Sequence, residues 1–417
     1  MMVIHQNIPR VSLIQFGIMK HSLRLATTTF LCLLFTGIAF AQDDSISLRN
    51  GDRVLFVGDG LFENELDYGY LEYALTTAWP KHDITFRNIG WSGDTPKGIS
   101  RDHFTNPPTA YEHLIEQIKT TDPTIAFVGY GAHMAFEAPD VSAGFIADLA
   151  SLVDTLEAID ARVVLITPVP LDPQSSPSPS VREKNERLKA VSEQITTLSQ
   201  TRSLGIIDLY NDMISPADDP NTAISDNGIQ LNELGYFIAG LVIDGNVNTP
   251  ERVTDLAIDL KKNLQSPTIK RIKKQDKSIA FELELERLPL LHPDVNPYQP
   301  REHTVTISGL PRGNYSLWSG NKKIKTASSR DWARGVTITS QHTDQGRQLL
   351  KQIYKKNRTY FYQYRPQNET YLVGFREYEQ GQNARELQLL DPLIGEIENE
   401  IGRLRVPRAL SMRLVAD

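Results

Sequence analysis

Four short blocks of glycine and polar residues follow predicted strands or precede a predicted helix, where residues that bind or transform a ligand lie in α/β proteins. Gly58–Leu61 directly follows the apolar run 53–57, Asn88–Asp94 follows a second such run, and Gly129–His133 follows a third. The fourth block, Asp226–Leu231, precedes a predicted helix. Acyl transfer needs a nucleophile, a base that takes its proton, an acid that orients the base, and amides that hold the negative oxygen that develops.

These blocks need a scaffold that brings them together, and residues 50–210 predict one. Short apolar runs alternate with longer helical patterns, which is typical of parallel strands joined by right-handed helical crossovers. The expected strands are 53–58, 84–89, 124–129, 162–167 and 205–209, and the expected helices are 68–78, 110–120, 143–158 and 180–201. Ligands bind at the carboxyl ends of such strands, so Asp59, 90–94 and 129–136 should share one edge of the sheet.

In this order and context the four blocks resemble those of the SGNH/GDSL hydrolase family. Gly58-Asp59-Gly60-Leu61 resembles the block Gly-Asp-Ser-Leu, and Asn88–Asp94 resembles the block whose glycine amide helps to bind the oxyanion. Residues 365–371, with the segment before them, are similar to secreted bacterial proteins of the same superfamily. The resemblance implies an α/β fold of three layers, flavodoxin-like, around a parallel sheet.

The resemblance also implies a nucleophilic serine, an oxyanion asparagine and a basic histidine, and this sequence replaces all three. Gly60 stands at the serine position, His133 at the asparagine position and Gln230 at the histidine position. Glycine offers no nucleophile, and the amide of glutamine does not titrate near neutral pH. Gly93 and Asp226 keep the family's residue types. The resemblance therefore implies a degenerate esterase site with no catalytic residue intact.

Residues of the same blocks leave a catalytic alternative open. Ser92 and Ser225 are candidate replacement nucleophiles, although each could instead serve its own loop or cap a turn. His133 could act as a base or donate to an anion, or it could be a loop histidine bonded to backbone. The glycine at position 60 could also reflect a turn that needs unusual backbone angles.

The same blocks suggest two further kinds of site. Asp59, Asp94, Asp226 and His133 are suitable ligands for a cation, but their spacing does not show that they converge, and we expect neither a metal nor a cofactor. Aromatic residues could line a pocket that stacks on a sugar ring, or they could belong to the core; these are Tyr68, Tyr70, Trp91, Tyr130 and Phe136.

The N-terminal residues 1–41 predict a cleavable secretory signal. Lys20 and Arg24 precede the apolar stretch 25–40, and Ala39-Phe40-Ala41 offers the small residues that a signal peptidase reads, so cleavage is expected before Gln42. Residues 1–18 then form an extension ahead of a start at Met19, and an N-terminal membrane anchor is the alternative. We expect a secreted or periplasmic protein without a stable membrane span after cleavage.

Composition restricts the partners of the mature chain. The single cysteine of the full sequence, Cys32, lies in the predicted signal, so no disulfide or thiolate metal site is expected in the mature chain. The mature chain keeps 41 basic residues against 51 acidic ones, a net charge of about −10 that disfavours nucleic acid and anionic membranes.

Three segments are expected after the signal. Residues 47–265 form the α/β domain, which ends in a helix over 250–265, and residues 266–343 form a small β module. The β module is indicated by the alternation over 280–286 and by glycine turns. Residues 344–417 form a helix-and-loop tail that packs on the α/β domain.

Two functions follow from these features. The first is a secreted protein that binds a carbohydrate or an acylated polymer in a cleft that has lost Ser-His hydrolysis. The second is an active hydrolase of ester bonds that uses other groups, such as Ser92 with His133 or an activated water. A structural role of the β module and tail in a surface assembly is a third possibility, and the sequence makes no prediction of oligomeric state.

Overall fold

The computed structural model describes the chain from residue 46 onwards, with gaps. The described ranges are 46–102, 108–138, 141–175, 179–218, 222–249, 252–253, 255–291, 302–339, 341–365 and 386–417. The predicted signal peptide, Cys32 and residues 366–371 lie outside these ranges. None of the helices within them has the length and apolar character that a membrane span requires.

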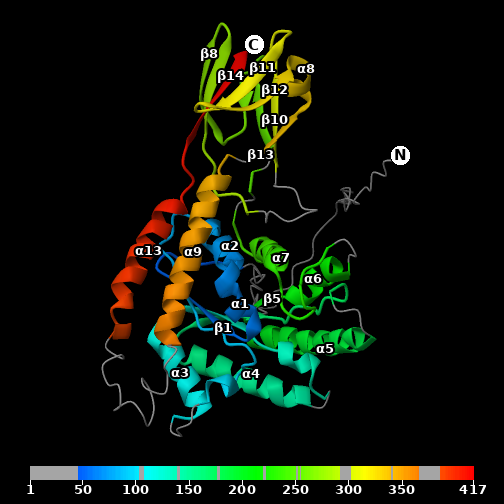
Figure 1. Cartoon of the computed structure of the whole chain (residues 1–417), viewed down its shortest axis with the longest axis vertical. Helices are drawn as coiled ribbons and strands as arrows, with labels where there is room; N and C mark the ends of the chain where they lie inside the picture. Colours follow the sequence, from blue (N-terminus) through cyan, green and yellow to red (C-terminus); the bar gives the residue numbers. More distant parts are fainter. Residues whose placement is uncertain are drawn as a thin grey trace, which may run out of the picture. The chain divides into compact units, whose positions relative to one another are not determined.

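Residues 53–207 form a parallel sheet that confirms the predicted α/β fold (Figure 1). Its strands are β1 (Arg53–Gly58), β2 (Thr85–Asn88), β3 (Ile125–Gly129), β4 (Arg162–Ile166) and β5 (Gly205–Ile207). They are hydrogen-bonded in the order β2-β1-β3-β4-β5, and every pair is parallel. This is the flavodoxin-like order, in which the chain reverses direction between β1 and β3 and leaves a crevice at their carboxyl ends.

Helices cover both faces of this sheet and make it the middle of three layers. They are α1 (Gly60–Tyr68), α2 (Tyr70–Ala78), α3 (Ala110–Thr121), α4 (Ser142–Glu157), α5 (Pro179–Arg202), α6 (Leu209–Asp218) and α7 (Glu233–Gly245). Successive strand residues belong to different cores: Phe56 packs in one cluster and Leu55 in the other. Since alternate side chains point to opposite faces, each face buries its own apolar layer.

The elements differ from the prediction at two places. The helix expected over 68–78 begins at Tyr70 as α2, and a separate helix that was not predicted, α1, precedes it and ends where Gly69 takes the left-handed conformation at φ 74°. The helix expected over 250–265 is wrong: β6 (Asp255–Asp259) and β7 (Leu264–Gln265) lie there instead. Buried and exposed residues alternate along β6, which is the period of a strand rather than that of a helix.

These two strands place the start of the β module before residue 266. One sheet has the order β13-β10-β6-β7 and the other the order β12-β11-β14-β9-β8. The further elements are β8 (Ile269–Gln275), β9 (Ser278–Leu283), β10 (Glu302–Ser308), β11 (Asn314–Ser319), β12 (Lys322–Ser328), α8 (Ser329–Arg334), β13 (Val336–Thr339) and β14 (Leu410–Ala416). The C-terminal strand β14 pairs with β9 and β11, so the predicted tail also completes this module.

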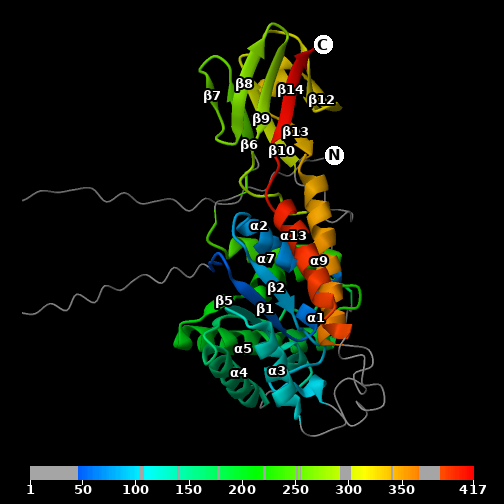
Figure 2. The same ribbon diagram turned by 90° about the vertical axis from the view of Figure 1, so that its left-hand side faces the viewer.

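Among its described residues, the predicted tail also contains two helices, α9 (Thr343–Tyr364) and α13 (Leu390–Leu404), which run side by side in both views (Figures 1 and 2). Leu349 and Ile353 of α9 and Ile397 and Ile401 of α13 are buried in the same core as Phe56. The tail therefore contributes to the interior of the α/β domain, as a helix with one apolar stripe does.

Candidate functional site

Gly60 opens helix α1 at the carboxyl end of β1, directly after its N-cap residue Asp59. Its φ is not positive, so the alternative that the turn needs unusual backbone angles at position 60 is wrong. A β-carbon built there would lie 3.5 Å from the Ser92 Oγ and 3.8 Å from the Asn64 Nδ2, which is ordinary contact. Position 60 therefore has room for a serine, and the backbone does not require glycine.

Asp59 ties the start of α1 to the loop after β3. Its Oδ1 accepts from the Leu61 amide at 3.2 Å, and its Oδ2 accepts from the amides of Gly131 and Ala132 at 3.2 and 3.1 Å. The carboxyl group is buried, and this burial raises its pKa to about 6 against the three amide bonds that lower it. Asp59 thus positions two of the blocks.

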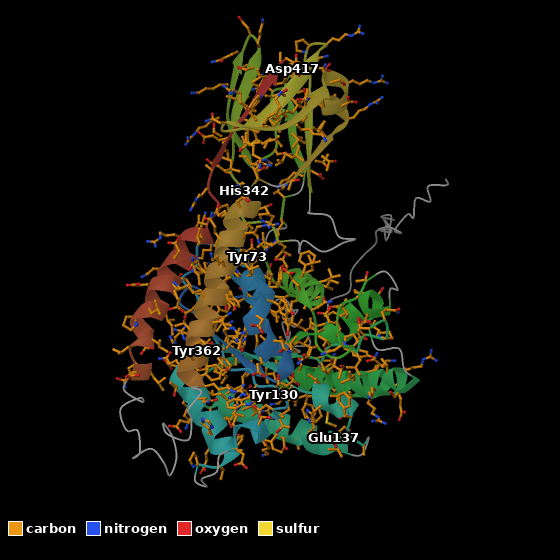
Figure 3. All side chains as sticks on the ribbon, in the orientation of Figure 1. Tyr73, Tyr130, Glu137, His342, Tyr362 and Asp417 are labelled. Atoms are coloured by element: carbon orange, nitrogen blue, oxygen red, sulfur yellow. The ribbon has the colours of Figure 1, made fainter. Side chains whose placement is uncertain are left out.

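The block after β2 is held in a similar way by a buried carboxylate. Asp94 forms an ion pair with Arg101, whose Nε donates at 2.9 Å, and both side chains are fully buried. The hydroxyl of Tyr130, labelled in Figure 3, also donates to Asp94, at 3.3 Å. Next to it, Gly93 has a φ of 77°, a conformation that favours glycine.

Two backbone amides of these blocks, at residues that line one cavity, have no acceptor among the described residues. In the described part of the chain, neither the Gly60 amide nor the Gly93 amide has a hydrogen-bond acceptor. The first N–H groups of a helix lack intrahelical acceptors and carry the positive end of its dipole, so they attract anions and polarised carbonyl oxygens. Gly60 therefore keeps an amide that can attract such an oxygen, but it has no side chain that could react with the bound group.

His133 lies on the 3₁₀ turn Ala132–Ala135 that follows β3. Its ring packs edge-on against Phe145, with the centroids 5.5 Å apart, and its Nδ1 is buried without a partner among the described residues. Burial lowers the pKa of His133 below 6.5, and the charges of Glu137 and Asp94 oppose this only in part. The ring is therefore neutral at pH 7 and can donate one hydrogen bond or accept one.

The fourth block departs from the sequence prediction. Gln230 Oε1 accepts from Asn227 Nδ2 at 3.2 Å, whereas the exposed Asp226 accepts from Asn232 Nδ2 at 3.0 Å. The partner of Gln230 is thus Asn227, three residues before it, and not Asp226. Counting three residues back from Gln230 would have found Asn227 in the sequence. Ser225 caps this turn, because its Oγ accepts from the Gly228 amide at 2.8 Å.

A cavity of about 280 Å³ joins the blocks. It is lined by Asp59, Gly60, Ser92, Gly93, His133 and Gln230, but not by Asp226. Its apolar wall consists of Leu61, Val169, Leu171, Leu188, Ile229 and Leu231. Of the aromatic candidates, Tyr130 and Phe136 line it, whereas Tyr68, Tyr70 and Trp91 do not. Nowhere in the described ranges do three His, Cys, Asp or Glu side chains gather as a metal ion would need.

Comparison with known proteins identifies the domain that holds this cavity. Residues 44–238 match the model of the GDSL-like lipase/acylhydrolase family. Residues 44–238 are thus a GDSL-like domain. The match covers the parallel sheet and all four blocks. No curated protein matches the sequence.

Several solved structures are similar to this chain, and one of them over most of its length. The fold is similar to that of BT4096, a gut microbial diltiazem-metabolizing enzyme, at a TM-score of 0.69 and 15% identity, over 90% of this chain and 100% of the other. An acetylxylan esterase from Geobacillus stearothermophilus matches at a TM-score of 0.40 and 14% identity, over 49% of this chain and 98% of its own. A lipolytic G-D-S-L family protein from Veillonella parvula matches at a TM-score of 0.36 and 16% identity, over 46% of this chain and 94% of its own.

Proposed function

We propose that the GDSL domain binds an acylated ligand, such as an acyl-bearing carbohydrate or polymer, without hydrolysing it by a serine and a histidine. One observation carries the proposal. Amides that could bind a carbonyl oxygen have no acceptor among the described residues, and the nucleophile that would attack the carbonyl carbon is absent. The Gly60 and Gly93 amides are available to a carbonyl oxygen, and no side chain at position 60 can attack it.

The cavity has the two surfaces that an acyl group needs. The Gly60 and Gly93 amides and the neutral ring of His133 can hold the carbonyl oxygen, and the leucine, isoleucine and valine wall can bury a short chain. Burial of each methylene contributes about 0.8 kcal/mol, so acylation would add measurably to affinity.

The groups opposite the amides support binding rather than turnover. Gln230 and Asn227 are hydrogen-bonded to each other, as a base and its orienting acid would be, but neither amide accepts a proton near neutral pH. In a hydrolase that lacks both nucleophile and base, only the oxyanion site and substrate binding still contribute to the reaction rate.

Restoring the missing groups tests this proposal. The purified protein should give no adduct with a fluorophosphonate probe and no turnover of short nitrophenyl esters. Gly60→Ser with Asn227→Asp and Gln230→His should gain both, since the serine fits and the aspartate keeps the acceptor contacts of Asn227. Gly60→Ala with the same two changes is the matched control and should stay inactive. A probe adduct on the unmodified protein would overturn the proposal.

Binding itself is measured by calorimetry with a butyrylated disaccharide and its unacylated parent. The acylated sugar should bind at least about tenfold more tightly. Ile229→Asp, in the cavity wall and 51% exposed, should abolish that preference, and Ile99→Asp, 62% exposed elsewhere, should not. Equal affinity for the two sugars would contradict an acyl site.

One observation favours a second candidate, an ester hydrolase with displaced groups. The Ser92 Oγ lies 3.5 Å from the β-carbon position of residue 60, in the cavity that His133 also lines. In this candidate the Ser92 oxygen attacks the ester carbon, His133 takes the hydroxyl proton and passes it to the leaving alcohol, and water then cleaves the acyl-serine. A fluorophosphonate adduct mapped to Ser92 and lost in Ser92→Ala would establish it.

We also propose that the protein is exported, with residues 1–41 as its signal. The charged start, apolar stretch and Ala39-Phe40-Ala41 support this proposal. N-terminal sequencing of the protein recovered from the producing cells should begin at Gln42. A mature protein that retains Cys32 would contradict it.

A further inference from the structure

The C-terminal half of α9 presents aromatic rings to solvent. Tyr354 is 42% exposed, and Tyr362, labelled in Figure 3, is 47% exposed near the end of the helix. Phe361 is partly exposed, and its ring lies edge-on to that of Tyr362, with the centroids 5.8 Å apart. None of the three belongs to a core cluster of the described residues. Exposed aromatic rings that gather on one element are typical of a binding surface.

Guanidinium groups lie between these rings and continue the row to the loop after β2. The Arg358 Cζ lies 5.9 Å from the ring centres of both Tyr354 and Phe361. The Arg365 Cζ lies 5.7 Å from the centre of Phe361 and 3.7 Å from that of Trp91. These five residues form a stacking row of planar groups, and its part on α9 is about 16 Å long at the rise of a helix.

Helix α1 places the stacking row beside the cavity of the GDSL domain. Its residues Gly60 and Asn64 line that cavity. Its residues Glu63 and Asp67 form ion pairs with the two guanidinium groups of the row. Residues three or four positions apart lie next to each other on a helix surface, so the cavity and the row are neighbours across α1.

The groups of the row indicate a sugar chain as the ligand. Both guanidinium groups already pair with carboxylates, so the row offers planar faces and N–H donors rather than net positive charge. A nucleic acid would need the charge that these carboxylates neutralise. The C–H faces of sugar rings pack on aromatic faces, and sugar hydroxyls accept from N–H groups. A polysaccharide presents such rings at regular intervals, as the row presents its planar groups.

We propose that the stacking row binds the sugar chain of an acylated polysaccharide whose acyl group lies in the cavity. The inference rests on the function proposed for the GDSL domain, and it names the ligand of that domain as a polymer rather than a small ester. Tyr354, Phe361 and Tyr362 stack on sugar units beyond the acylated one.

The length of the sugar chain tests the proposal. Butyrylated cellohexaose or xylohexaose should bind at least about tenfold more tightly than the butyrylated disaccharide of the same series, because only the longer chain reaches the row. Calorimetry with the full chain measures the four affinities. The unacylated hexasaccharides are measured beside them, so that the contribution of the acyl group and that of the chain are separated.

Two double variants test which residues give the longer chain its advantage. Tyr354→Ser with Tyr362→Ser should lower the affinity for the butyrylated hexasaccharide about tenfold, to that of the disaccharide. Tyr354→Phe with Tyr362→Phe keeps both rings and should keep the affinity. Leu264→Ser, 61% exposed on β7, controls for the loss of an exposed apolar side chain and should bind as the natural protein does. All these positions are exposed, so the melting temperature should change little.

Three outcomes would overturn the proposal, and they differ from one another. Equal affinities of the hexasaccharide and the disaccharide in both series would refute the row, while a preference for the butyrylated disaccharide over its unacylated parent would still support the acyl site. An advantage of the hexasaccharide that persists in Tyr354→Ser with Tyr362→Ser would place the chain on another surface. Equal affinities of the butyrylated and unacylated hexasaccharides would show that no acyl group is bound, which refutes the proposed function as well.

Discussion

Asp59 is the residue on which the geometry of the cavity in the GDSL domain most depends. Its two oxygens accept three amides, one from the first turn of α1 and two from the loop that carries His133. No other side chain in the described blocks bonds both segments. The same burial that makes these bonds strong raises the pKa of Asp59 to about 6.

This pKa predicts a pH dependence of stability. The folded-state pKa is above the unfolded value of 3.8, so the folded protein binds more protons between these values, and the contribution of Asp59 is lost as pH rises through 6. Relative to Asp59→Asn, the free energy of unfolding of the natural protein should rise by about 1 kcal/mol from pH 7 to pH 5. Urea denaturation at each pH measures this difference.

Asp226→Asn is the control for that experiment, because Asp226 is exposed and bonded only within its own loop to Asn232. The difference in free energy of unfolding between Asp226→Asn and the natural protein should not show the change between pH 7 and pH 5 that is expected for Asp59→Asn. A difference for Asp59→Asn that shrinks on acidification would mean that the carboxyl group is not protonated near pH 6.

At single positions the sequence predicted most of the cavity but not its hydrogen bonds. Gly60, Gly93, His133 and Gln230 were identified because their blocks resemble those of the GDSL family in order and in place. Asn227 was missed because Asp226 beside it has the residue type that the family uses. Whether Asn227 or Asp226 pairs with Gln230 depends on the geometry of the turn, which the residue types alone do not define.

At the scale of elements, α9 is the part of the fold that the sequence specified least. Lys356 of α9 is 1% exposed and donates to Glu72 of α2 at 2.6 Å and to the Phe86 carbonyl of β2 at 3.0 Å. These partners are 284 and 270 residues away in the sequence, so no local pattern could predict the pairing. The predicted tail was identified as helical only from its own composition.

The buried pair predicts a large cost when it is broken from one side. Lys356→Met leaves the Glu72 carboxylate buried without its cation and should lower the free energy of unfolding by about 3 to 5 kcal/mol. Lys356→Met with Glu72→Leu replaces the pair by apolar groups and should recover most of that loss. Urea denaturation of the two variants measures it, and equal destabilisation of both would show that packing, not charge, is responsible.

The end of α9 also bears on the acyl site. The Arg365 guanidinium lies 3.7 Å from the centre of the Trp91 ring and pairs with Glu63, whose other oxygen accepts from the Ser92 amide at 2.6 Å. This chain of contacts holds the loop that presents the Gly93 amide. Arg365 is therefore a positioning residue in our interpretation.

Arg365→Ala should weaken binding of the butyrylated disaccharide by about five- to tenfold while lowering the free energy of unfolding by about 1 kcal/mol or less. Arg365→Lys keeps the charge but loses the planar stacking, so it should recover only part of the affinity. Calorimetry and urea denaturation separate the two effects. If the affinity falls only in proportion to the free energy of unfolding, Arg365 stabilises the fold and does not position the binding site.

At the scale of the whole molecule, the chain folds around separate cores. The helices α9 and α13 share a core with the parallel sheet, whereas the β module has its own, built on Trp332, Leu317 and Phe281. The boundary between them could not be predicted from residue order, because β14 returns from the end of the chain to pair with β9. Alternation marks a strand in the sequence, but its partner strand is set by long-range packing.

These separate cores predict two unfolding transitions in calorimetry. Trp332 is fully buried, and its Nε1 donates to the Tyr315 carbonyl at 3.1 Å, so Trp332→Ala should cost the β module about 3 to 5 kcal/mol. The transition of the β module should move to lower temperature, while the transition of the GDSL domain and its two tail helices should stay in place. Leu71→Ala, in the other core, should do the reverse. A single transition that shifts equally with either change would show that the two cores unfold as one.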